Sequence, residues 1–212
     1  PAIADVTGDG VPEIIVFDER LNVMAVSGEG EVLWTGYPEI TGSHPQITVA
    51  DLDADGSPEV LADGVVLDGV TGAVEQSFSL PAEMIARMPA AGDIDLDGFQ
   101  EIIIGSSCYS HDGELRWSSD ISGTYGHWSA ILDVDDDLYG EVAMVGNGEL
   151  AIYDTDGTEL FRNPAGTGQP GPPCVADFDG DGESELGWAS SSQFNLYELD
   201  GSVIWTRAIT DQ

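Results

Sequence analysis

The stretch that decides the fold is Asp177-Phe178-Asp179-Gly180-Asp181-Gly182-Glu183-Ser184-Glu185. Its nine residues place acidic side chains at positions 1, 3, 5 and 9 and a glycine at position 6. Oxygen donors at alternate positions around a tight turn are the ligands that a Ca²⁺ ion requires. The same pattern occurs four times earlier in the chain, as DVTGDGVPE (5–13), DLDADGSPE (51–59), DIDLDGFQE (93–101) and DVDDDLYGE (133–141). Five copies in register indicate a repeated cation site, and we number them loops one to five.

Each loop has a predicted ligand set in which positions 1, 3, 5 and 9 coordinate through side chains and position 7 through its backbone carbonyl. These residues are Asp5, Thr7, Asp9, Val11 and Glu13 in loop one; Asp51, Asp53, Asp55, Ser57 and Glu59 in loop two; Asp93, Asp95, Asp97, Phe99 and Glu101 in loop three; Asp133, Asp135, Asp137, Tyr139 and Glu141 in loop four; and Asp177, Asp179, Asp181, Glu183 and Glu185 in loop five. The sequence therefore predicts up to five Ca²⁺ ions, and the alternative is a set of solvated acidic turns.

Two loops depart from the pattern. Thr7 replaces aspartate at position 3 of loop one, which removes a charge but keeps an oxygen. Leu138 replaces glycine at position 6 of loop four, at a cost of about 1 kcal/mol or more if the turn keeps a left-handed φ. We therefore expect loops two, three and five to bind Ca²⁺ more strongly than loops one and four.

The loops belong to a repeat of 40 to 46 residues, because their first aspartates stand at positions 5, 51, 93, 133 and 177. An apolar run follows each acidic loop, a second run comes a few residues later, and a glycine-containing turn follows, usually Asp-Gly. Asp-Gly between β-rich runs is a strong hairpin signal. Four residues after the turn glycine stands an aromatic residue in four repeats (Trp34, Trp117, Phe161 and Trp205) and Gln76 in the other, and we expect these residues to pack between neighbouring repeats.

Each repeat therefore predicts four short antiparallel strands, which we call A to D, with the acidic loop between A and B. Repeats of this kind and length fit the blades of an all-β propeller. We expect a single domain over residues 1–212, with repeats at about 1–44, 45–88, 89–128, 129–172 and 173–212. Five visible repeats leave two alternatives, a five-bladed propeller or part of a larger one.

Composition limits the classes of partner. The formal net charge is −35 and all five basic residues are arginines, which argues against nucleic acid and anionic membranes as partners. Five bound Ca²⁺ ions would reduce the net charge to about −25. No apolar run approaches the roughly 20 residues that span a bilayer. Cys108 and Cys174 are too few for a disulfide scaffold, and we expect both to be free and buried.

With DxDxDGxxE between two β-runs at this repeat length, the whole chain resembles FG-GAP/VCBS repeat proteins, the integrin-α-like propellers. The resemblance implies a propeller, usually of seven blades, with structural Ca²⁺ in the A–B hairpins. It also implies an extracellular, cell-surface or periplasmic setting and a role in adhesion or ligand recognition. A structural repeat domain of a larger secreted or surface protein is the alternative.

Strand direction predicts that the A–B loops and C–D turns share one face and that the longer D–A connections lie on the other. Those connections carry Tyr37, His44, Tyr125, His127 and Trp128, which we expect to bind a glycan or protein ligand, while plugging of the channel is the alternative. A polysaccharide lyase or glycosidase is a weaker hypothesis, because the carboxylates placed by the motif are used for metal and the arginines are scattered. We therefore expect no catalytic residues.

Overall fold

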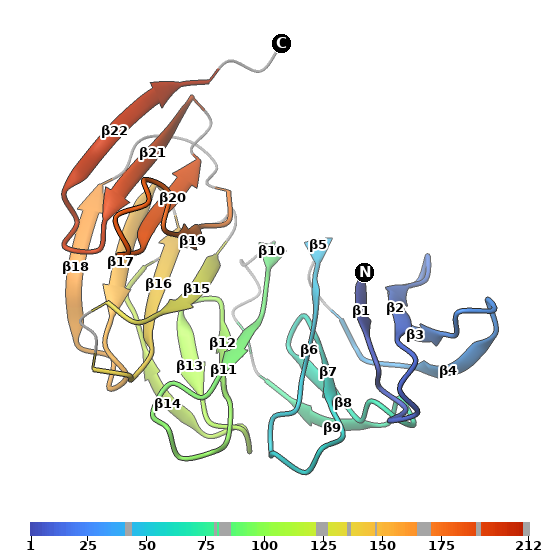
Figure 1. Cartoon of the computed structure of the whole chain (residues 1–212). Coiled ribbons are helices and arrows are strands. Elements are labelled where there is room, and N and C mark those ends of the chain that lie inside the picture. Colours follow the sequence, from blue (N-terminus) through green and yellow to red (C-terminus); the bar gives the residue numbers. More distant parts are fainter. Residues whose placement is uncertain are drawn as a thin grey trace.

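The computed structural model describes residues 1–40, 44–78, 80, 86–121, 127–134, 137–146, 148–164, 171–189 and 192–209. Within these ranges the chain is all-β, with five four-stranded antiparallel sheets and no helix. In every sheet the strands follow one another in chain order, as a meander. The sheets lie side by side in sequence, with the first and the fifth at the two ends (Figure 1).

The strands have the following bounds. Sheet one contains β1 (Ala2–Ala4), β2 (Glu13–Phe17), β3 (Val23–Val26) and β4 (Val32–Gly36). Sheet two contains β6 (Ile47–Ala50), β7 (Glu59–Ala62), β8 (Val65–Leu67) and β9 (Val74–Ser77). Sheet three contains β11 (Ala90–Gly92), β12 (Glu101–Ile104), β13 (Ser107–Tyr109) and β14 (Leu115–Ser118). Sheet four contains β15 (Trp128–Leu132), β16 (Glu141–Gly146), β17 (Glu149–Tyr153) and β18 (Glu159–Pro164), and sheet five contains β19 (Cys174–Ala176), β20 (Glu185–Ala189), β21 (Gln193–Glu198) and β22 (Val203–Ala208).

The predicted strand order A to D is observed in all five sheets, with each acidic loop between the first and second strands. The Asp-Gly turns join the third and fourth strands, as their hairpin chemistry predicts. In sheet three, for example, Gly113 donates its N–H to the Ser110 carbonyl at 2.9 Å and has φ of 87°. That left-handed φ is available to glycine without a Cβ clash.

The core lies between neighbouring sheets. Four buried apolar clusters are present, one at each junction between successive sheets. Three of the four strand-D aromatics take part as predicted, because Trp34, Trp117 and Phe161 each pack on the C–D turn of the next sheet. Trp34 donates its indole N–H to the Gly69 carbonyl at 2.9 Å, and a Cβ at Gly72 would overlap the same indole. Trp117 bonds to the Thr155 carbonyl in the same way, at 2.9 Å.

The two ends of the array lack this cover. Ile14 on β2 is 42% exposed, whereas its counterparts in the other four sheets are at most 1% exposed (Val60, Ile102, Val142 and Leu186). Trp205 on β22 is 40% exposed, whereas Trp34 is 9% exposed. The C–D turn glycine of sheet one, Gly30, has no heavy atom near the position of a Cβ. In the described part of the chain, neither end face has the packing that joins neighbouring sheets.

Two features differ from or add to the sequence expectations. Both cysteines are free, but only Cys108 is buried, while Cys174 is exposed. Cys174 lies on an edge strand opposite Gly187, which has no side chain to cover it. A short parallel pair, β5 (His44–Pro45) with β10 (Ala86–Arg87), joins two connections between sheets, and no repeat signal predicts it. Among the described residues, no helix is long and apolar enough to cross a membrane.

Candidate metal centres

The position 9 glutamate is the buried residue of each acidic loop. All five are between 0% and 8% exposed: Glu13, Glu59, Glu101, Glu141 and Glu185. In every loop the Oε2 atom of this glutamate accepts the backbone N–H of position 2, at 2.5 to 3.1 Å. The glutamate begins the second strand, so its backbone is held in the sheet while its carboxylate is directed back under the loop. A buried carboxylate of this kind requires a cation or further donors to compensate its desolvation.

The aspartates at positions 1 and 5 hold the turn itself. In loop two Asp51 accepts the N–H groups of Asp55 and Gly56 at 3.1 and 3.0 Å, and loop three repeats both bonds with Asp93. The position 5 aspartate accepts the N–H of position 7 in all five loops, at 2.7 to 2.9 Å. These bonds draw the carboxylates inward around one centre.

The turn requires two left-handed residues, of which the sequence indicated only one. At position 6, Gly56 and Gly98 have φ of 90° and 97°, and Leu138 has φ of 77°, so position 6 of loop four keeps the left-handed conformation without a glycine. Position 4 is left-handed as well, with φ of 58° at Ala54 and 61° at Leu96. Glycines at position 4 of loops one and five, Gly8 and Gly180, are the signal that could have revealed this requirement.

Three loops gather their carboxylates closely enough for one ion. Oxygen atoms within 4.8 Å of one another come from the groups Asp51, Asp53 and Glu59; Asp93, Asp95 and Glu101; and Asp177, Asp179, Asp181 and Glu185. These are loops two, three and five, the loops expected to bind most strongly. Loop one forms no such group among the described residues, and Asp135 of loop four lies outside them.

Loop five contains a buried carboxylate oxygen that a bound cation would satisfy. Glu185 is fully buried, and its Oε1 atom has no hydrogen-bond partner. This oxygen belongs to the same group as the carboxylates of Asp177, Asp179 and Asp181. An unsatisfied buried carboxylate oxygen is costly, and a hard divalent cation with oxygen ligands would satisfy it. The residues of loop five therefore match the chemistry of Ca²⁺.

The buried glutamates lead to a prediction about pH. Burial, followed by the charges of neighbouring carboxylates, raises the pKa of Glu59 to about 7 from a usual 4.5. The folded metal-free protein then binds more protons than the unfolded chain between pH 4.5 and 7, so its stability falls as pH rises through this range. We expect a higher melting temperature at pH 5 than at pH 8 in EDTA. Glu59→Gln should weaken this dependence, and an unchanged dependence in the variant would assign it to other groups.

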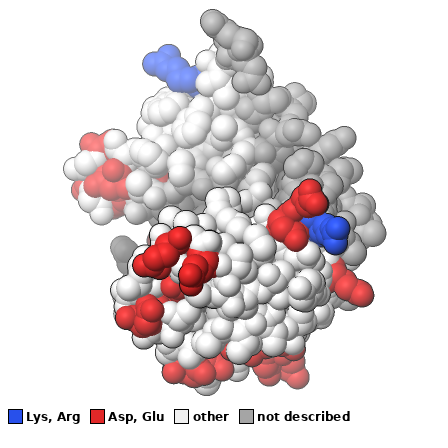
Figure 2. All heavy atoms as spheres, turned by 90° about the vertical axis from the view of Figure 1, so that its right-hand side faces the viewer, with Lys and Arg blue, Asp and Glu red and all other residues white. Residues whose placement is uncertain are grey.

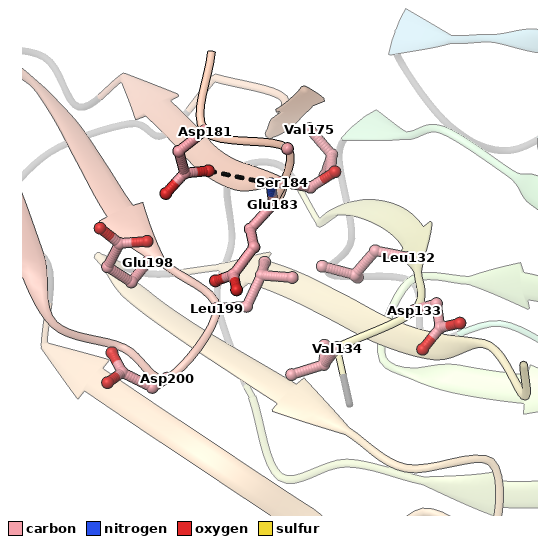
Figure 3. A pocket seen from close by; sticks show the side chains of 11 residues that line it. Leu132, Asp133, Val134, Val175, Asp181, Glu183, Ser184, Glu198, Leu199 and Asp200 are labelled. Carbon is pink, nitrogen blue, oxygen red and sulfur yellow. Dashed lines mark hydrogen bonds between the residues drawn. The ribbon is translucent and has the colours of Figure 1, made fainter. Parts of the chain in front are cut away.

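The acidic loops and the C–D turns lie on the same side of the sheets, as expected. The cavity drawn in Figure 3, of about 730 Å³, is lined by Asp181 and Glu183 of loop five and by Glu198 and Asp200 at the C–D turn. Burial and then the nearby carboxylates raise the pKa of Glu198. Figure 2 shows acidic side chains in separate groups on the face that it displays, with few basic ones. The cavity beside loop five, with its four carboxylates, therefore favours cations over anionic ligands.

The residues expected on the other face differ in accessibility. Tyr37 is 71% exposed. His127 is only 3% exposed, and Trp128 is partly buried against the apolar cluster between sheets four and five. Tyr125 and the side chain of His44 lie outside what the structure describes. Of the three described side chains, Tyr37 is the one that offers most of its ring to a ligand.

No family model matches the chain, and no curated protein matches it in sequence. Solved structures do resemble it. The Vibrio cholerae biofilm matrix protein Bap1 is 25% identical, with a TM-score of 0.76 over 97% of this chain and 38% of Bap1. A Bacillus licheniformis rhamnogalacturonan lyase is 19% identical, with a TM-score of 0.56 over 96% of this chain and 56% of the lyase.

An Agrocybe aegerita lectin specific for non-reducing terminal N-acetylglucosamine is 13% identical, with a TM-score of 0.52 over the whole of this chain and 66% of the lectin. The likeness to the lyase and the lectin establishes the fold alone. The chain spans 38% to 56% of the length of the first structures that it matches. These structures therefore support an all-β fold built from repeated blades.

Proposed function

We propose that this chain is an extracellular Ca²⁺-binding β-propeller module that recognises a glycan or protein ligand and has no catalytic activity of its own. The observation that carries the calcium part is the buried, unpartnered Oε1 atom of Glu185 among three aspartates of the same loop. The resemblance of the repeats to FG-GAP/VCBS blades supports a structural role for the ions. Extracellular sites of this kind bind Ca²⁺ with a Kd of about 10⁻⁴ to 10⁻³ M, which suits a secreted or cell-surface protein.

The recognition part rests on the exposed ring of Tyr37 and on the Bap1 likeness. Tyr37 follows β4 directly, on the connection toward sheet two. A rigid aromatic ring on a connection between packed sheets is a usual platform for a sugar or a protein partner. The cavity beside loop five is acidic, so a neutral or basic ligand fits this molecule better than an anionic one.

We further propose that the five sheets are part of a larger propeller. The exposure of Ile14 and Trp205 supports this alternative over closure at five, because ring closure would cover both residues. A structural repeat domain within such a protein remains the second candidate function. Ligand binding separates the two.

The test is a binding screen of the chain in millimolar Ca²⁺ against immobilised neutral and acidic polysaccharides and extracellular proteins. We expect at least one saturable ligand whose binding falls about tenfold in Tyr37→Ala, as for loss of an aromatic contact of about 1 to 1.5 kcal/mol. Phe178→Ala is the control, because Phe178 is 49% exposed but lies on the acidic-loop side and belongs to no predicted ligand set. If no ligand binds, the structural candidate replaces recognition. If unsaturated products appear from a pectin, the chain is a lyase.

A further inference from the structure

All five sheets contain the same irregularity between their third and fourth strands. In sheet three Cys108 pairs with Trp117 and Tyr109 pairs with Leu115, so that Arg116 has no partner in the register. The same β-bulge leaves one extra residue on the fourth strand of every sheet: Leu33, Glu75, Arg116, Leu160 and Ile204. A bulge redirects a side chain out of the regular alternation of a strand. A bulge repeated at one position in every sheet therefore places five side chains, of four residue types, in equivalent locations.

That location adjoins the acidic loop of the same sheet. In sheet three the guanidinium of Arg116 contacts Asp95 Oδ2 at 2.6 Å and Glu101 Oε1 at 2.7 Å. Both carboxylates belong to the predicted ligand set of loop three. Arg116 therefore brings a fixed positive charge to the centre where a metal ion would bind.

The bulge residue also lies beside the acidic loop in sheet one. In sheet one Leu33 lines a cavity of about 350 Å³ together with Thr7, Asp9 and Glu13 of loop one. The bulge position thus places an apolar side chain beside loop one and a basic side chain beside loop three.

The Oε1 atom of the position 9 glutamate shows what the Arg116 guanidinium contributes. Glu101 and Glu185 occupy position 9 of loops three and five and are 1% and 0% exposed. The Oε1 atom of Glu101 is paired with Arg116, whereas the Oε1 atom of Glu185, with Ile204 at the bulge, has no partner. The guanidinium thus satisfies in loop three the atom that is left unsatisfied in loop five.

We propose that the bulge residue on the fourth strand sets the metal dependence of the acidic loop in its own sheet, and that Arg116 is the resident cation of loop three. Loop three is then ordered without Ca²⁺ and binds it weakly, because an entering ion must displace a paired guanidinium or lie beside it. This inference rests on the proposed calcium binding of loops two and five.

The test compares two variants of the full chain by equilibrium dialysis with Ca²⁺ and by melting in EDTA. Arg116→Met keeps an apolar stem and removes the charge, and Ile204→Arg places the charge beside loop five. We expect Arg116→Met to bind one more ion, with at least about a tenfold gain in affinity at loop three. We expect Ile204→Arg to bind one ion fewer. In EDTA, Arg116→Met should melt lower than the parent chain, and in saturating Ca²⁺ the difference should shrink.

The outcomes separate this inference from calcium binding itself. If the parent chain binds Ca²⁺ and Arg116→Met changes neither the number of ions nor the affinity, the role of Arg116 is overturned while the calcium proposal stands. If no protein binds Ca²⁺, the calcium proposal fails, and a lower melting temperature of Arg116→Met in EDTA still shows that Arg116 compensates Glu101. An equal melting temperature there would refute the resident cation as well. If Ile204→Arg does not fold, Arg116→Met alone decides.

Discussion

Removal of Ca²⁺ with EDTA is expected to lower the melting temperature by roughly 10 to 20 °C, the largest effect that the structure predicts. An ion that binds only the folded state adds about 2.7 kcal/mol at one hundred times its Kd. For a chain of this size each kcal/mol shifts the melting temperature by about 2 to 4 °C. The estimate counts two ions, in loops two and five, because loop three contains Arg116. Differential scanning calorimetry with excess EDTA and with about 10 mM Ca²⁺ measures the shift.

Two controls separate site binding from general charge effects. The chain carries a formal charge of −35, so any salt relieves some repulsion, and NaCl of equal ionic strength measures that part. Asp177→Asn removes a carboxylate from the loop-five group and should abolish about half of the Ca²⁺-dependent shift. If the melting temperature is the same in EDTA and Ca²⁺, the ions are not structural.

The sequence predicts the repeated parts of the fold because their causes are local. A nine-residue acidic loop, an apolar run and an Asp-Gly turn lie within a few residues of one another, so their spacing places four strands per repeat. The position of Glu185 is predictable for the same reason, since position 9 begins the second strand of its sheet. Packing of Trp34 between repeats follows from its recurrence alone.

The remaining features depend on contacts that no short pattern encodes. The bulge that directs Arg116 to loop three is a shift in pairing register, and a sequence does not show register. The left-handed Ala54 and Leu96 are tolerated because the surrounding carboxylates hold the turn, against the preference of each residue. The burial of His127 depends on the cover that neighbouring elements provide, whereas the sequence places it on a connection expected to be exposed.

The junctions between sheets lead to the second large effect. Trp34→Ala should destabilise the protein by about 3 to 5 kcal/mol, the usual cost of removing a buried large aromatic side chain. The substitution also leaves the Gly69 carbonyl without the indole N–H that it accepts at 2.9 Å. Trp205 occupies the same position on the fourth strand of sheet five but is 40% exposed. Trp205→Ala should therefore cost only about 1 to 2 kcal/mol, measured by urea unfolding in saturating Ca²⁺.

Glycine substitutions test the same contact from the opposite side. Gly30 and Gly201 are equivalent turn residues with φ of 85°, so alanine carries the same backbone cost at both positions. A Cβ at Gly201 would overlap the ring of Phe161, whereas one at Gly30 meets nothing. The excess destabilisation of Gly201→Ala over Gly30→Ala thus measures the contact between sheets without the backbone term. Equal losses for the two glycines, or for Trp34 and Trp205, would show that the end faces are covered in solution, because an uncovered face has no packing to lose.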